Sequence, residues 1–83
     1  PLIERIESCA TDTLWVTDAA VRARDLGQVL HIELFVVAEG HTPTAEDLED
    51  LRDRVRDLDW KAHDISVVLV TELPEHLLDE AAS

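Results

Sequence analysis

Few side chains of this 83-residue chain could do chemistry, and most of them are potential ligands for a divalent metal ion. His31 and Glu33 lie two residues apart inside the apolar stretch VLHIELFVV. Side chains at this spacing on a strand point to the same face, roughly 7 Å apart at the backbone, so they could share an ion with a third ligand from a neighbouring segment. Alternatively, the pair marks the wetter face of a strand whose other face is buried. Both interpretations stay open from the spacing alone.

The other candidate ligands are scattered along the chain. They are His41 in a turn, His63 and Asp64 at the start of the last apolar stretch, and Glu72 near its end. Zinc requires four nitrogen, sulfur or oxygen donors in tetrahedral geometry. None of the candidates has HxxxH or CxxC spacing, and adjacent residues such as His63 and Asp64 face opposite sides of a strand. The candidate cofactor is therefore Zn²⁺ or another divalent transition-metal ion, and the alternative is that the chain binds none.

Charge and composition narrow the class of function. The chain carries 19 acidic and 7 basic residues, a formal charge of −12, which is opposite to the basic surface that nucleic acids require and favours cations instead. The lone Cys9 cannot pair within the chain, which fits a reducing compartment, and we interpret it as a small buried hydrophobe of the first helix. Gly27 and Gly40 are the only glycines, so a glycine-rich phosphate loop is missing, and we expect no enzyme.

The elements that must position these side chains follow from the apolar spacing. The pattern predicts a helix at about 2–11, strands at 14–24 and 29–38, a helix at 44–59, a strand at 64–72 and a tail at 74–83. Gly27 lies in the turn between the first two strands, which predicts a hairpin. Thr44 or Thr42 can cap the long helix, and Pro43 is tolerated at its first turn.

Helices cover only one face of so small a sheet, so the opposite face is either solvated or covered by another molecule. Phe35 and Val37 would lie there beside Val68 and Val70, forming an apolar patch that we interpret as a homodimer interface. We expect Trp15 and Trp60 to pack over the two ends or edges of the sheet.

The stretch VRARDLGQVLHIELFVVAEGHTPTAEDLEDLRDRV resembles the cytosolic C-terminal domain of cation diffusion facilitator (cation efflux) transporters. The pattern of Arg22, Arg24, Gly27, the apolar strand and the capped helix carries this resemblance, which extends from about Ile3 to Pro74. It implies a ferredoxin-like, metallochaperone-like α+β fold of order αββαβ, with three strands and two helices on one face. It also implies one domain over 1–83, on the cytoplasmic side of the cell membrane, preceded by a transmembrane transport domain.

The resemblance further implies a V-shaped homodimer that divalent ions such as zinc tighten to favour transport. It places the family's strand histidine at Phe35, a second histidine at about Leu48, and a third near Val70 and Thr71, with Glu72 close to a family carboxylate. Either the metal site has moved along the strand, or an apolar dimer contact has replaced it, and we favour the second. The predicted function is thus a regulatory and dimerisation domain of a divalent-cation efflux transporter. The alternatives are a free-standing soluble metal carrier and an ion-free protein-interaction module.

Overall fold

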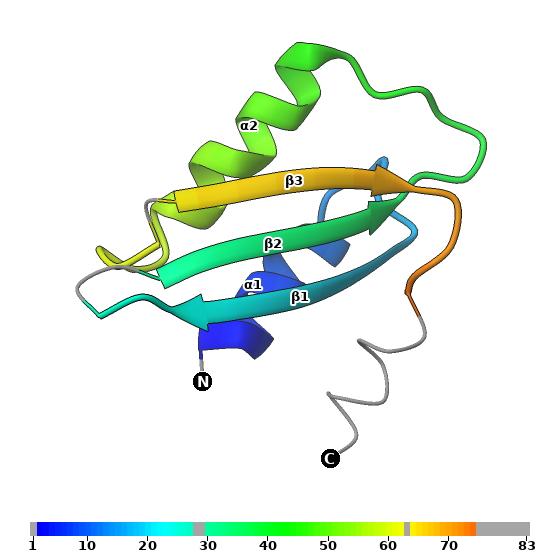
Figure 1. Ribbon diagram of the computed structural model, residues 1–83. Coiled ribbons are helices and arrows are strands. Elements are labelled where there is room, and N and C mark those ends of the chain that lie inside the picture. Colours follow the sequence, from blue (N-terminus) through cyan, green and yellow to red (C-terminus); the bar gives the residue numbers. More distant parts are fainter. Residues whose placement is uncertain (1, 28–29, 63, 75–83) are drawn as a thin grey trace.

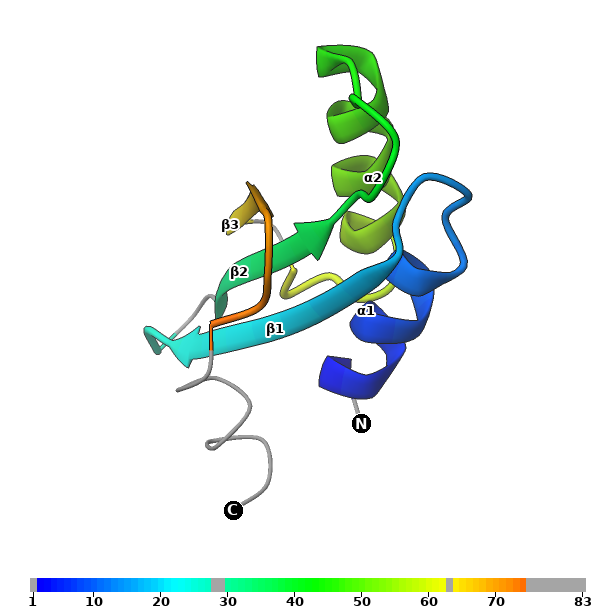
Figure 2. The same ribbon diagram turned by 90° about the vertical axis from the view of Figure 1, so that its right-hand side faces the viewer.

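The computed structural model describes residues 2–27, 30–62 and 64–74. This part of the chain holds two helices and three strands, which are α1 (Leu2–Thr11), β1 (Asp18–Asp25), β2 (Leu30–Val37), α2 (Ala45–Arg56) and β3 (Asp64–Val70). The strands form one sheet, and both helices lie on the same side of it (Figures 1 and 2). The α+β architecture predicted from the sequence, with two helices on one face, is confirmed. Neither helix in the described residues is long and apolar enough to cross a membrane.

The sheet order is β1-β2-β3, so β2 lies in the middle. β1 and β2 pair antiparallel as a hairpin, with Val21 opposite Leu34, whereas β2 and β3 pair parallel, with Leu34 opposite Val67. Parallel strands need a long crossover connection, and α2 provides it. Helix α1 packs on β1 and α2 packs on β3, so each helix covers one side of the central strand.

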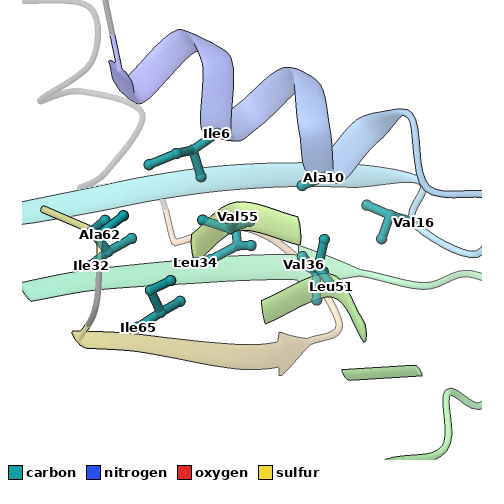
Figure 3. Packing of buried hydrophobic residues seen from close by; sticks show 10 residues of the cluster. All are labelled: Ile6, Ala10, Val16, Ile32, Leu34, Val36, Leu51, Val55, Ala62 and Ile65. Carbon is teal, nitrogen blue, oxygen red and sulfur yellow. The ribbon is translucent and has the colours of Figure 1, made fainter. Parts of the chain in front are cut away.

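The core lies between the helices and the sheet (Figure 3). It takes alternate residues of the central strand and residues about one turn apart on each helix, as the two periodicities require. Its members are Ile6, Ala10, Val16, Ile32, Leu34, Val36, Leu51, Val55, Ala62 and Ile65. Cys9 is half-buried and packs against this cluster, consistent with its interpretation as a small hydrophobe.

Two arginines join the helices. Arg5 of α1 donates from Nη2 to the carbonyl oxygen of Leu58, just beyond the end of α2, at 3.1 Å. In return, Arg54 of α2 donates from Nη1 to Oγ1 of Thr13, just beyond the end of α1, at 2.9 Å. Each arginine therefore reaches the C-terminal end of the other helix, where free carbonyl groups favour a positive charge.

The first strand begins four residues later than the sequence predicts. Residues 12–16 form turns, because the Thr13 amide donates to the Ala10 carbonyl and the Val16 amide donates to the Thr13 carbonyl, both at 3.0 Å. Val16 is consequently drawn into the core, while Leu14 is fully exposed. The strand-forming residue types at 14–17 thus belong to a tight connection, and the predicted strand 14–24 is corrected to β1.

Helix α2 also ends earlier than predicted, at Arg56 rather than at residue 59. Turns follow it, and the Trp60 side chain is 70% exposed, so the expectation that it packs over the sheet edge is wrong. The Lys61 ammonium group instead lies 5.4 Å from the centroid of the Trp60 ring. β3 ends at Val70, two residues before the predicted end, and the predicted residues Val29 and 75–83 lie outside the described residues.

Candidate metal site and the outer face of the sheet

The face of the sheet that points away from the helices, called here the outer face, is set by the strand register. Its residues are Asp18, Ala20, Arg22 and Arg24 on β1, His31, Glu33, Phe35 and Val37 on β2, and Asp64, Ser66, Val68 and Val70 on β3. It divides across the strands into two halves. The apolar half holds Ala20, Phe35, Val37, Val68 and Val70, with the charged Asp18 at its end, and the charged half holds Arg22, Arg24, His31, Glu33 and Asp64, together with Ser66.

His31 and Asp64 form the closest pair of candidate ligands in the described residues. They face each other across the parallel β2–β3 pair, and Nδ1 of His31 lies 2.8 Å from Oδ2 of Asp64. The His31 side chain is 29% exposed and the Asp64 side chain is 58% exposed. In the neutral tautomer of His31 that carries its proton on Nδ1, the imidazole donates this hydrogen bond to the carboxylate, and Nε2 is then the free, oriented nitrogen. This carboxylate–histidine arrangement is the one that metal-binding histidines adopt in proteins.

Glu33 lies on the same face as His31, as the sequence predicts. An arginine next to it competes with a metal ion for its carboxylate. Arg22 of β1 stands directly opposite Glu33, and Ser66 of β3 stands on its other side. Arg24 stands opposite His31. The positive charges of Arg22 and Arg24 next to Glu33 and His31 lower the attraction of this part of the face for a cation.

His41 lies beyond the opposite end of β2 and has different partners. Its ring stacks on that of Trp15, with centroids 6.2 Å apart and planes inclined by 21°, and its Nε2 lies 3.6 Å from Oδ2 of Asp47. The backbone N–H of Thr44 donates to the Asp47 carboxylate at 2.9 Å. This bond, more than the Thr44 side chain or His41, holds the pKa of the Asp47 carboxyl below its usual value. His41 is thus built into the start of α2 and lies far along the sheet from His31.

The remaining candidate ligands do not join either pair. Glu72 lines a shallow hollow of about 270 Å³ with Thr17, Asp18 and Val37 at the far end of the sheet. His63 lies outside the described residues. Within residues 2–27, 30–62 and 64–74, no three His, Cys, Asp or Glu side chains lie close enough to hold one metal ion. One described chain therefore presents a two-residue arrangement, His31 with Asp64.

The predicted dimer residues do lie together in the apolar half. Phe35 stands opposite Val68 and Val37 stands opposite Val70. The side chains of Phe35, Val68 and Val70 are half-buried within a single chain. Val37 is only 7% exposed, because it stands at the end of the sheet where the chain turns back after β3. Three of the four predicted residues thus still offer apolar surface to another molecule.

Architecture and register together define the class of fold, a small α+β domain of ferredoxin-like type. Solved structures of the MamM CTD, the C-terminal domain of a cation diffusion facilitator, are similar to it. A cadmium form has a TM-score of 0.72 and 18% identity, over 87% of this chain and 95% of that one. A nickel form has a TM-score of 0.72 and 17% identity, over 87% and 96%. A copper form matches with a TM-score of 0.72 and 17% identity, over 87% and 95%.

At this level of identity, the likeness establishes the fold. The ferredoxin-like fold implied by the resemblance is thereby confirmed. No protein-family model matches the chain, and no curated protein sequence matches it.

Proposed function

We propose that this chain is the cytosolic regulatory and dimerisation domain of a divalent-cation efflux transporter. The fold that it shares with the MamM CTD supports the class of domain, and MamM CTD structures in cadmium, nickel and copper forms support divalent ions as the ligand class. The acidic charge of −12 favours cations over anions as ligands. In this proposal the domain works beside a membrane transport domain, as the resemblance implies.

The observation that carries the metal-binding part is the contact between His31 and Asp64. The oriented imidazole nitrogen supplies one donor of a zinc-type site, and Glu33 on the same face is the nearest additional ligand in register. A second copy facing the outer face would supply an equal set of donors. In this proposal, metal binding is coupled to the association of two copies through the outer face, since each copy alone lacks a complete metal site.

A second candidate is an ion-free protein-interaction domain. The arginines Arg22 and Arg24 favour it, because they stand opposite Glu33 and His31 and lower the attraction for a cation. In that case, the apolar half around Phe35 and Val68 would hold two copies together, and the charged half would only orient them.

Calorimetric titration of the purified chain with zinc, together with small-angle X-ray scattering, tests the proposal. We expect zinc binding and a smaller radius of gyration of the dimer in its presence. His31→Gln should abolish both effects, whereas the matched variant His41→Gln should retain them, because His41 lies at the other end of β2. A dimer that neither binds zinc nor changes in size would support the ion-free function, and loss of binding in both variants would place the site elsewhere.

A further inference from the structure

The two edges of the sheet differ in their protection against other strands. β1 has four charged residues among its eight, and charged side chains are a common means of keeping a sheet edge from pairing. β3 has none between Ile65 and Val70, and this stretch also lacks proline and glycine. Within the described residues, β2 is the only strand paired with β3, so the other side of β3 is open (Figure 1). An uncharged edge without proline or glycine readily accepts another strand.

The side chains along this edge are also incompletely covered. Leu69 points to the helix side of the sheet and yet is 47% exposed, and Val67 beside it is half-buried. They lie beneath α2, whose packing on β3 leaves the end near Leu69 open. A hollow of about 320 Å³ lined by Leu69, Val70 and Ala38 marks the same end.

The flank of α2 above this edge contains a buried hydrogen-bond donor that has no acceptor among the described residues. Arg54 and Leu58 mark the flank that faces α1, and Arg52 and Leu48 lie on the opposite flank, towards the β3 edge. Nε of Arg52 is buried and has no hydrogen-bond partner among the described residues. A buried donor without an acceptor lowers the stability of the fold. Acceptor groups of a neighbouring molecule would therefore stabilise this flank.

We propose that the open edge of β3 pairs antiparallel with β3 of a second copy of this chain, giving one continuous sheet of six strands. A second copy fits because the edge from Ile65 to Val70 carries no charge on either copy, so two chains of net charge −12 approach there at the least electrostatic cost. A two-fold axis uses the same patch on both copies, so this interface by itself joins two copies. This interface differs from the outer face used in the proposed function, and it involves no metal.

Full overlap of the seven residues fixes the register. Val67 is the midpoint of Asp64–Val70, so it stands opposite Val67 of the other copy, and Ile65 stands opposite Leu69. Asp64 then stands opposite Val70, so this register never places two like charges across from each other. The pairing buries the exposed Leu69 side chain and brings the second copy beneath the Arg52 flank of α2.

Disulfide cross-linking between copies tests this register directly. In a Cys9→Ser background, Val67→Cys places two thiols on directly opposed residues, where Cβ atoms are close enough for a disulfide. The matched control is Ala23→Cys, an exposed position on the edge strand β1. We expect covalent dimers of the Val67→Cys chain under mild oxidation at protein concentrations where Ala23→Cys gives only the slow background of random collision. Equal rates for the two variants would overturn the proposal.

Sedimentation equilibrium provides the second test and separates the two interfaces. Leu69→Lys should weaken the dimer about tenfold or more, since a lysine on the edge opposes pairing, and its fold is checked by circular dichroism. Phe35→Ser, on the outer face, should leave the cross-linking of Val67→Cys unchanged. A wild-type chain that stays monomeric, or cross-linking lost with Phe35→Ser, would overturn edge pairing. A chain that pairs through the β3 edge but does not bind zinc would contradict only the metal-binding part of the proposed function. If Leu69→Lys does not fold, the cross-linking rates decide.

Discussion

Nδ1 of His31 lies 2.8 Å from Oδ2 of Asp64, although the two residues are separated by 33 positions and by the whole of α2. The contact exists because β2 and β3 run parallel with His31, the second residue of β2, opposite Asp64, the first residue of β3. It joins one residue from each of two sequence pairs, His31 with Glu33 and His63 with Asp64. A histidine oriented by a carboxylate is ready to bind a metal through its other nitrogen.

Removing the charge of Asp64 should therefore weaken metal binding without abolishing it. We expect Asp64→Asn to lower the zinc affinity by about 10–100-fold, the usual effect of losing the group that orients a histidine ligand. Competition titration with a chromogenic zinc chelator measures the change. Asp53→Asn is the control, because Asp53 is exposed on α2 and, in the described part of the chain, its carboxylate pairs only with Arg56, at 3.6 Å. Equal affinities of the Asp64 and Asp53 variants would show that Asp64 does not orient a ligand.

The capping box at the start of α2 should contribute measurably to stability. Oγ1 of Thr44 accepts from the amide of Asp47 at 3.1 Å, and the Thr44 amide donates to the Asp47 carboxylate. Thr44→Ala should lower the free energy of unfolding by about 1 kcal/mol, within a range of about 0.5–2 kcal/mol. Urea unfolding monitored by circular dichroism measures this loss. Thr42→Ala, in the exposed turn before it, should change stability little, and a similar loss in both variants would contradict a specific role for the cap.

The same cap predicts a pH dependence with a definite sign. The Thr44 amide lowers the pKa of Asp47 in the folded chain, so its carboxylate stabilises the fold above the usual aspartate pKa of about 4. This contribution is lost as the pH falls through the lowered pKa. The stability difference between wild type and Asp47→Asn should thus be clear at neutral pH and shrink in acid. Urea unfolding of wild type and Asp47→Asn at neutral and at acidic pH measures this stability difference. The control Asp50→Asn, on the exposed face of α2, should differ little from wild type in stability at either pH. A difference that grows in acid would contradict the assignment.

Arg54 should resist conservative replacement in a way that Arg56 does not. Arg54 is half-buried and reaches both Oγ1 of Thr13 and the carbonyl oxygen of Cys9, the latter at 3.5 Å. Lysine cannot reproduce two such directed bonds, so Arg54→Lys should cost about 1–2 kcal/mol of unfolding free energy. Arg56→Lys should cost less than about 0.5 kcal/mol, because Arg56 makes only an exposed pair with Asp53. Thermal unfolding of both variants gives the comparison, and equal losses would contradict this role of Arg54.

Local patterns predict most of the fold. The spacing of Ile6 and Ala10 on α1, and of Leu51 and Val55 on α2, marks the buried sides of the two helices, and these residues are in the core. The alternation of Ile32, Leu34 and Val36 marks the inner face of β2 in the same way. These patterns are reliable because burial on one face is decided by neighbours in sequence.

Contacts decided by tertiary register could not be predicted in this way. The position of Asp64 opposite His31 depends on the register of a parallel pairing across α2, and aligning the starts of the two strands would place Leu30 there instead. The stack of Trp15 on His41 joins two connecting segments and has no local signal. The turn at Thr13–Val16 was missed because its residues are strand-forming types, and backbone hydrogen bonds outweigh that preference.

The division of the outer face into an apolar half and a charged half limits how a partner sheet can lie against it. Sheets that pack face to face stack their strands nearly aligned, and their contact requires apolar side chains on both sides. Here the apolar side chains that remain accessible are Phe35, Val68 and Val70, while the rows through Glu33 and His31 carry charged side chains. A partner sheet that packs on the apolar half also extends over the charged half. The two sheets would then be in contact at the apolar end and apart at the charged end. A cation bound between the charged halves of two such copies would draw the diverging ends together.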